Sequence, residues 1–393
     1  MEELVKIHDL NVRFHTYEGV VQALDGVNFS IFKEETLGLV GETGSGKTVT
    51  GLAILRLIMP PGKIEGGEIF FDIDGNGLVD LLKISESEMR EVRGAQIAMV
   101  FQEPGSALNP VFTIGEQLTE GILLHRHEEI ARVAADNLEH FLSGKSGAMT
   151  KVLRPFRIVQ EKLYRNISEN RRQGLSRFIE RTPVVHRMVR GMRAEADKIA
   201  ISLLREVEIP DAERIMKQYP YELSGGMKQR IVIAMALSCY SKLIIADEPT
   251  TSLDVTIQVQ IVELLKKLKM ERNSSLLYIT HNLGVAAEIC DRVAVMYAGN
   301  ICEVASVVDI FKNPLHPYTK ALMAAVPKPG EEPRAIGGSV PDALSLPAGC
   351  RFHPRCSKAI DKCRQICPQL TEVAPGHFIA CHLFRGENSG ISN

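Results

Sequence analysis

The sequence lacks both a long hydrophobic run and an excess of one charge. No uninterrupted apolar stretch approaches the roughly 18 residues that a membrane-spanning helix needs, and the longest covers only residues 231–237. The formal net charge is -2, so the basic balance typical of nucleic-acid-binding proteins is absent. The first ten residues do not have the basic and then apolar layout of a signal peptide. We therefore expect a cytoplasmic protein with no nucleic-acid partner.

Cysteine is scarce along most of the chain and frequent only near its end. Five of the eight cysteines follow residue 349, namely Cys350, Cys356, Cys363, Cys367 and Cys381. Disulfides are rare in a cytoplasmic protein, so this pattern favours ligation of a metal or a cluster. From about residue 327 the composition shifts to proline and glycine. We expect a linker and a small Cys-rich domain over residues 327–393.

Apolar segments that suit strands alternate with segments that suit helices. Short strands are expected over residues 5–10, 20–24 and 27–31, and further strands over 36–40, 68–72, 96–101, 243–246 and 275–280. Helices are expected over residues 49–58 and 255–270, and residues 114–218 are expected to be mostly helical. Alternating strands and helices predict an α/β fold with a largely parallel sheet.

One segment has the pattern of a phosphate-binding loop. Residues 41–48, GETGSGKT, fit G-x-x-x-x-G-K-[ST] and lie between an expected strand and an expected helix. The glycines allow backbone N–H groups to surround phosphate oxygens at a helix N-terminus. In such loops the lysine, here Lys47, reaches the β- and γ-phosphates, and the hydroxyl of Thr48 holds Mg²⁺. The segment predicts binding of ATP with Mg²⁺.

A second candidate lies at the end of the expected strand over residues 243–246. Asp247 and Glu248 follow four apolar residues, so the strand would deliver two carboxylates at the edge where α/β proteins bind ligands. Asp247 is expected to hold Mg²⁺. Glu248 is the candidate general base for the attacking water.

Between these two motifs the sequence resembles the ATP-binding cassette (ABC) family. Residues 223–227, LSGGM, match the family signature, Gln102 the Q-loop, residues 252–254 the D-loop and His281 the switch histidine. The resemblance implies a P-loop NTPase domain over residues 1–326, with a helical subdomain at about 104–235. It also implies that Ser224, Gly225 and Gly226 contact a nucleotide held by another subunit. A second Gly-rich loop that opens a helix suits such an anion contact.

The resemblance also assigns individual residues to the site. Those expected to bind the nucleotide within this chain are Gly41, Thr43, Gly44, Ser45, Gly46, Lys47, Thr48, Val49, Gln102, Asp247 and Asp254. Mg²⁺ is assigned to Thr48, Gln102 and Asp247, and catalysis to Glu248, His281 and Gln102. The family stacks an aromatic ring on adenine, for which Tyr17 is the candidate and Phe14 the alternative.

Several longer stretches resemble the dipeptide and oligopeptide permease branch. They are ADEPTTSLDVTIQVQI, VMYAGNICE, NPLHPYTKALMAAVP and PAGCRFHPRCSKAIDKC. The branch implies a [4Fe-4S] cluster on Cys350, Cys356, Cys363 and Cys381, although four thiolates also suit structural zinc. It implies as partners a second, homologous ATPase in a heterodimer, two membrane permease subunits and an extracellular solute-binding protein. The complex would place the chain at the cytoplasmic face of the membrane.

One part of the chain departs from this pattern, a basic insertion at about residues 125–194. Within it, residues 151–193 carry the bases Lys151, Arg154, Arg157, Lys162, Arg165, Arg171, Arg172, Arg177, Arg181, Arg187, Arg190 and Arg193. It suits a solvated helical elaboration, or a basic surface that meets anionic lipid or the permease. A nucleic-acid role is disfavoured because no aromatic stacking pattern accompanies the bases.

Two other functions compete with the transport ATPase. One is a non-transport member of the superfamily that acts in repair or translation. Repair members carry long heptad-patterned arms, which this insertion lacks, and translation members usually hold two cassettes, whereas one phosphate loop is present. The other is an iron–sulfur redox regulator, which would need the C-terminal region to control activity. The ordered motifs favour the transport ATPase.

Overall fold

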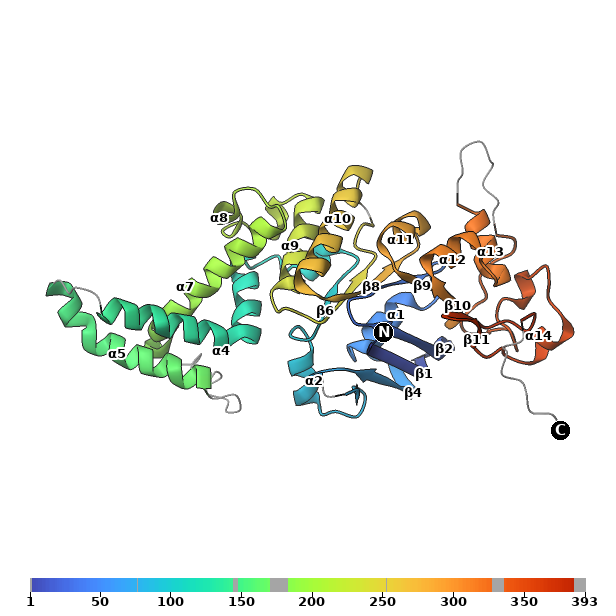
Figure 1. Cartoon of the computed structure of the whole chain (residues 1–393), viewed down its shortest axis with the longest axis horizontal. Coiled ribbons are helices and arrows are strands. Elements are labelled where there is room, and N and C mark those ends of the chain that lie inside the picture. The colour runs from blue at the N-terminus through green and yellow to red at the C-terminus, as the bar shows by residue number, and fades with distance from the viewer. Residues whose placement is uncertain are drawn as a thin grey trace. The chain divides into compact units, whose positions relative to one another are not determined.

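The computed structural model describes residues 2–75, 77–143, 148–169, 183–251, 253–326 and 336–384. The chain forms two compact units (Figure 1). One unit contains Met1–Gln102 and Ser241–Asn393, and the other contains Glu103–Tyr240. The expected boundary at residue 327 stays a prediction, because it lies outside the described residues.

The larger unit is built on an eight-stranded sheet with the order β11-β12-β10-β9-β3-β8-β7-β6. Its strands are β3 (Thr36–Val40), β6 (Ile97–Val100), β7 (Leu243–Asp247), β8 (Ser275–Thr280), β9 (Arg292–Tyr297), β10 (Asn300–Ser306), β11 (Thr371–Ala374) and β12 (His377–Ile379). The run from β9 to β6 is parallel, which confirms the predicted α/β fold with a largely parallel sheet. The three remaining strands pair antiparallel.

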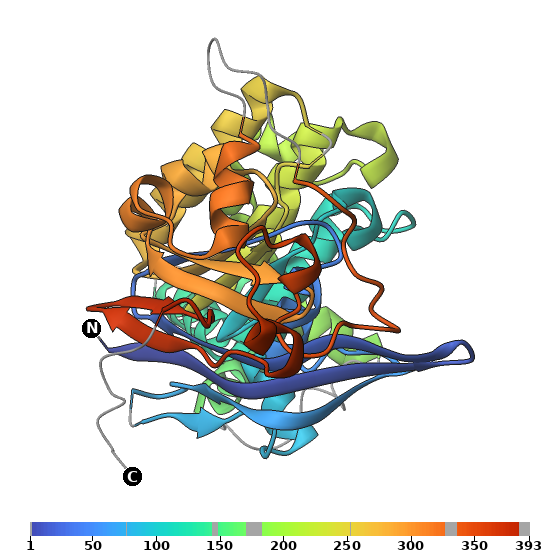
Figure 2. The ribbon, with the colours of Figure 1, turned by 90° about the vertical axis from the view of Figure 1, so that its right-hand side faces the viewer.

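A second sheet of four antiparallel strands has the order β2-β1-β4-β5. The strands are β1 (Glu3–Thr16), β2 (Gly19–Phe32), β4 (Gly62–Phe71) and β5 (Val79–Asp80). The prediction of three short strands before residue 32 was wrong, because β1 and β2 are continuous over 14 residues each (Figure 2). The polar residues that were interpreted as ends of short strands lie at β-bulges within the long strands instead. The register shifts between Ile7 and Leu10, where Asp9 has φ 47°.

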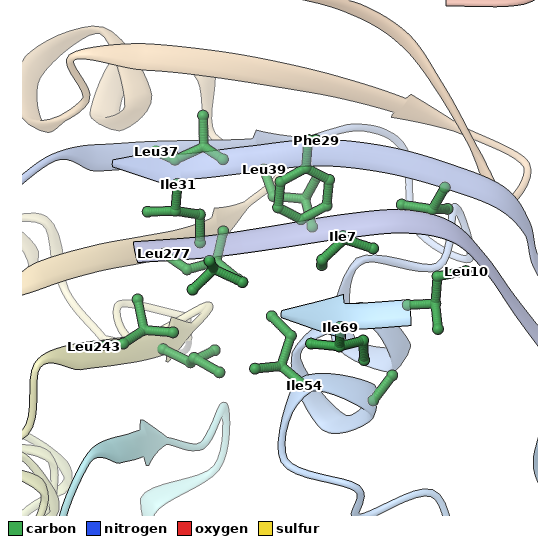
Figure 3. Packing of buried hydrophobic residues seen from close by; sticks show 14 of the residues in the cluster. Ile7, Leu10, Phe29, Ile31, Leu37, Leu39, Ile54, Ile69, Leu243 and Leu277 are labelled. Carbon is green, nitrogen blue, oxygen red and sulfur yellow. The ribbon is translucent and has the colours of Figure 1, made fainter. Parts of the chain in front are cut away.

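Apolar side chains from both sheets and from helix α1 (Lys47–Ile54) form one core. Ile7, Ile31 and Ile69 of the antiparallel sheet are 0–2% exposed, as are Leu39 and Leu277 of the parallel sheet (Figure 3). Burial of this kind stabilises a fold by about 1.5–3 kcal/mol per large aliphatic side chain. The core therefore fixes β3 and α1, and with them the loop that joins them.

Helices complete the larger unit. They are α2 (Glu86–Val92), α10 (Val255–Arg272), α11 (Leu283–Ile289), α12 (Val307–Lys312), α13 (Pro317–Ala324) and α14 (Asp361–Gln365), with a 3₁₀ turn η2 (His353–Arg355). The predicted helix over residues 49–58 ends early, at Ile54.

The Cys-rich end of the chain belongs to this unit and extends its sheet. β12 pairs with β10 at Glu303 and Val304, and the red strands run beside the orange ones in Figure 2. The fully buried carboxylate of Glu303 accepts hydrogen bonds from the backbone N–H groups of Leu315 and His316. It also lies 2.7 Å from the His377 ring. The strand pairing and the His377 contact hold the C-terminal strands on the sheet.

The smaller unit is helical. Its elements are α3 (Pro104–Ala107), α4 (Ile114–Ser143), α5 (Ala148–Glu169), α7 (Pro183–Glu206), α8 (Ala212–Ile215), η1 (Pro220–Glu222) and α9 (Gly225–Leu237). In the basic insertion, Arg165 forms ion pairs with Glu139 and Glu161, as in a solvated helical face. The side chains of eight predicted bases lie outside the described residues: Lys151, Arg154, Arg171, Arg172, Arg177, Arg181, Arg187 and Arg190. In the part of the chain that the structure describes, no helix is long and apolar enough to cross a membrane.

Candidate nucleotide site

The phosphate loop connects β3 to α1. An added Cβ at Gly41 would lie 2.1 Å from the carbonyl oxygen of Met296, so no side chain fits there. Gly44 and Gly46 have φ of 80° and 104°, in the region that favours glycine. Gly46 precedes the first residue of α1. The sequence therefore folds into a narrow turn at a helix N-terminus, as the motif predicts.

Lys47 lies inside this loop. Its ammonium group donates hydrogen bonds to the carbonyl oxygens of Gly41 at 2.9 Å and Glu42 at 3.0 Å. Burial lowers its pKa, against the raising effect of Glu248, Asp247 and Glu42. A lysine held against backbone carbonyls can exchange these partners for phosphate oxygens, which carry a full negative charge.

Thr48 and Asp247 meet at the carboxyl edge of the parallel sheet. The Thr48 hydroxyl donates a hydrogen bond to the Asp247 carboxylate at 3.1 Å. Burial raises the pKa of Asp247 to about 6, although the Thr48 hydrogen bond opposes the shift. Hydroxyl and carboxylate oxygens are ligands that Mg²⁺ prefers, and a cation beside Asp247 would compensate the cost of its burial. These two residues fit the predicted Mg²⁺ site.

Glu248 follows β7 in a left-handed conformation, with φ 45°. Such strain in a residue other than glycine persists only where its surroundings fix it. Here the Glu248 N–H donates to the carbonyl oxygen of Ile279 at 2.9 Å. Its carboxylate accepts hydrogen bonds from Gln102 at 3.2 Å and Thr251 at 3.0 Å. Two side chains thus hold the Glu248 carboxylate, and β8 holds its backbone.

His281 adds a fourth contact. Its Nδ1 lies 3.1 Å from the Glu248 carboxylate, and the residue follows the end of β8. The structure therefore brings together Gln102, Glu248 and His281, which sequence analysis assigned to catalysis.

These groups border a cavity of about 430 Å³. Among the predicted residues, Gln102, Glu248, His281 and residues 43–49 line it. Nine lining residues were not predicted: Val21, Gln22, Ala23, Thr251, Ala298, Val340, Pro341, Ala343 and Leu346. Thr251 and Ala298 lie in stretches that resemble the permease branch. The other seven follow no motif, so the sequence carried no signal for them. Only the fold brings β2 and residues 340–346 to the phosphate loop.

The predicted residues Tyr17, Phe14 and Asp254 do not line the cavity. Tyr17 is 98% exposed and Phe14 packs on the core; neither lines the cavity. Asp254 caps α10, where its carboxylate accepts a hydrogen bond from the N–H of Ile257 at 3.0 Å. Ser252 of the predicted D-loop lies outside the described residues.

The signature residues belong to the helical unit. Ser224 caps α9, and its hydroxyl accepts a hydrogen bond from the N–H of Met227 at 3.4 Å. Gly225 and Gly226 form the first turn of this 13-residue helix. The N–H groups of a first turn lack partners within the helix. They suit contact with an anion, as predicted.

Four of the C-terminal cysteines lie near one another. Burial, with smaller contributions from the neighbouring Cys363, Cys381 and Cys356, raises the pKa of Cys350 to about 11. The Cys350 N–H donates to the carbonyl oxygen of Cys363 at 2.8 Å. Within the described residues, however, no group of three or more His, Cys, Asp or Glu side chains is placed to hold a metal ion. The predicted iron–sulfur cluster is therefore not confirmed.

The parallel sheet, the phosphate loop and the carboxylates at the next strand end define a P-loop nucleotide-binding protein. Comparisons with known proteins narrow this class. A family model described as "ABC transporter" matches residues 24–251, and one described as "Oligopeptide/dipeptide transporter, C-terminal region" matches residues 302–363. The chain belongs to the ABC transporter family, and its larger unit carries the ATPase site of that family.

Similar proteins cover nearly the whole chain. A "Probable peptide ABC transporter ATP-binding protein" of Sinorhizobium fredii is 42% identical, covering 96% of this chain and 94% of the relative. The "Oligopeptide transport ATP-binding protein AppD" of Bacillus subtilis is 40% identical and covers 99% of both chains. A solved dimeric ATP-binding cassette, MJ0796 bound to ADP and Pi, has a TM-score of 0.52 at 23% identity. It covers 77% of this chain and 98% of its own, and it supports the fold alone.

Proposed function

We propose that this chain is the ATP-hydrolysing subunit of an importer of dipeptides or oligopeptides, at the cytoplasmic face of a membrane. The observation that carries the proposal is the full-length similarity to ATP-binding proteins of peptide transport. It includes the C-terminal region that the peptide-transporter model covers. Nothing in the described residues favours the repair, translation or redox alternatives.

In this proposal each residue of the site has a separate role in ATP binding or hydrolysis. Lys47 and the loop N–H groups bind the β- and γ-phosphates. Thr48 and Asp247 would hold Mg²⁺, which would supply positive charge to neutralise the phosphates. Glu248 accepts a proton from the attacking water. The hydrogen bonds from Gln102 and Thr251 aim its carboxylate. His281, 3.1 Å from the same carboxylate, donates toward the γ-phosphate.

The proposal requires a second ATPase. This chain supplies one phosphate loop and one signature helix, and the family pairs each loop with the signature of a partner. We assign Ser224, Gly225 and Gly226 to the nucleotide of a homologous second chain. Two permease subunits and an external solute-binding protein complete the importer. ATP then acts as a switch at the interface of the two ATPases.

The test uses Ser224→Arg in the reconstituted importer. A long cation at a tight first turn removes the anion contact by bulk and by geometry. Peptide uptake and ATP turnover of the complex should fall, while the isolated variant should bind ATP through Lys47 as the parent does. Loss of ATP binding by the isolated variant would indicate misfolding. Unchanged uptake would contradict the shared site, and a parent complex that hydrolyses ATP without moving peptide would contradict the importer.

For the C-terminal cysteines we propose that Cys350, Cys356, Cys363 and Cys381 come together as ligands when a four-iron cluster binds, since in the described structure they are not yet placed to hold a metal ion. The support is the resemblance of their spacing to the peptide-permease branch, the hydrogen bond of 2.8 Å that brings Cys350 to Cys363, and four-thiolate chemistry. Protein purified without oxygen should carry about four irons per chain. Replacing any of the four cysteines by serine should remove the iron, and Cys239→Ser should not. Stoichiometric zinc without iron would contradict the cluster.

A further inference from the structure

The segment over residues 336–355 borders the nucleotide cavity through four of its residues. Val340, Pro341, Ala343 and Leu346 lie in its wall. The carbonyl oxygen of Ala343 accepts a hydrogen bond of 3.0 Å from the N–H of Gln22. The segment thus runs along β2, and both line the same cavity.

Two arginines anchor this segment just beyond the cavity. Arg355 donates to both carboxylate oxygens of Glu42, at 2.7 and 3.1 Å. It also donates to the carbonyl oxygen of Gly337 at 2.9 Å. Arg351 pairs with Asp25 and donates to the carbonyl oxygen of Ala298 at 2.8 Å. Both arginine side chains are less than 9% exposed. Bidentate pairs of this kind fix geometry, so the wall has a defined position relative to the phosphate loop.

The lining of the cavity has two chemical halves. Lys47, Gln102, Glu248 and the loop N–H groups suit a charged, hydrated ligand end. Val21, Val340 and Leu346 suit an apolar or aromatic end. A nucleoside triphosphate has both ends joined in one molecule, and ligand sites combine apolar walls with a few placed polar groups. Tyr17 is 98% exposed and does not line the cavity.

We propose that residues 340–346 form the apolar wall against which the base and ribose of ATP lie. The C-terminal region would then contribute directly to nucleotide binding. This inference rests on the proposed function only in taking ATP as the ligand. Contact with the segment is independent of the peptide, the permease and the second ATPase.

The test separates the nucleoside from the phosphates. The isolated full-length chain is titrated with MgATP and, separately, with magnesium tripolyphosphate, which has three phosphates and no nucleoside. The test variant combines Val340→Ser and Leu346→Ser. The control is Leu344→Ser, in the same segment, because Leu344 does not line the cavity and its side chain lies near Gly19.

The double variant should bind MgATP about tenfold more weakly, since two apolar contacts each contribute about 1 kcal/mol or less in a half-open site. Its affinity for tripolyphosphate should stay within about twofold of the parent. The control should match the parent with both ligands. The proposal would be overturned if the affinities for MgATP and for tripolyphosphate fell by the same factor. It would also be overturned if neither affinity fell. A negative result for the wall at residues 340–346 would not contradict the proposed peptide import. A negative result for peptide import would not change the ratio of the two affinities.

Discussion

The phosphate loop, residues 41–48, and the C-terminal segment, residues 336–355, serve one cavity in opposite ways. The loop lines the cavity with residues 43–48, among them the cation Lys47. The segment lines the cavity with apolar side chains. Its charged groups, Arg351 and Arg355, do not line the cavity and form ion pairs with Asp25 and Glu42. Phosphate binding demands glycine and lysine at fixed spacing, which makes a motif. Apolar contact can be made by many residues, so its sequence is inconspicuous.

The largest expected effect lies on the phosphate side. Glu248→Gln keeps the shape of the side chain and removes the base, so hydrolysis in the assembled transporter should slow by about 10²–10⁴-fold. MgATP binding to the isolated chain should persist, because Lys47 and Thr48 are unchanged. Stopped-flow phosphate release measures the rate. Turnover within a few-fold of the parent would remove Glu248 from this role.

The stability of the larger unit should depend on pH through His316. His316 is 2% exposed beside Glu303, and burial holds its pKa at about 4 against an ordinary 6.5. Between these values the unfolded chain binds a proton that the folded chain does not, so stability is lost as the pH falls from about 6.5 toward 4. From pH 7 to pH 5 the loss from this residue should be about 2 kcal/mol.

His316→Asn isolates that effect. Asparagine does not titrate in this range, and its side-chain oxygen can still accept the hydrogen bond that the His316 ring accepts from the N–H of Tyr318. Urea unfolding at pH 7 and pH 5 should show a smaller pH dependence in the variant than in the parent. Equal pH dependence in both proteins would show that His316 is not the titrating group.

An intermediate effect should link the two regions through Arg355 and Glu42. Arg355→Met leaves a carboxylate without its guanidinium in the phosphate loop, where it repels phosphate. MgATP should bind about tenfold more weakly, as expected for loss of a hydrogen-bonded charge pair. Adding Glu42→Gln removes the repulsion and should restore much of the affinity, a coupling that a double-mutant cycle measures.

Arg364→Met provides the matched control for this cycle. Arg364 lies on α14 of the same C-terminal region and is exposed, so its replacement should leave MgATP affinity unchanged. Additive effects of the Arg355 and Glu42 changes would mean that the ion pair does not position the loop.

The smallest effect is expected at Tyr17. Because its ring is 98% exposed outside the cavity, Tyr17→Ala should change MgATP affinity by less than about twofold. Equilibrium titration with a fluorescent ATP analogue is sufficient. If the affinity for MgATP falls by more than this and the affinity for tripolyphosphate does not change, Tyr17 stacks on adenine. The contrast between the two regions would then be weaker.

The parts of the molecule that could be predicted from the sequence are those whose chemistry restricts residue choice. Lys47, Thr48, Asp247 and Glu248 could be predicted because phosphate, Mg²⁺ and water activation each require particular groups at strand ends. The continuous strands β1 and β2 could not, since Asp9 and Gly26 resemble turn residues but lie within the paired strands. The cavity wall at residues 340–346 depends on long-range contacts, such as the hydrogen bond from Gln22 to Ala343, which leave no local pattern.

Amide hydrogen exchange tests most directly whether both regions bind one nucleotide. The Glu248→Gln chain, which should hold ATP without hydrolysing it, is compared alone, with MgATP and with magnesium tripolyphosphate. Both ligands should slow exchange in residues 41–48, and only MgATP should slow it in residues 340–346. Protection of residues 41–48 by MgATP with no change in residues 340–346 would contradict the account.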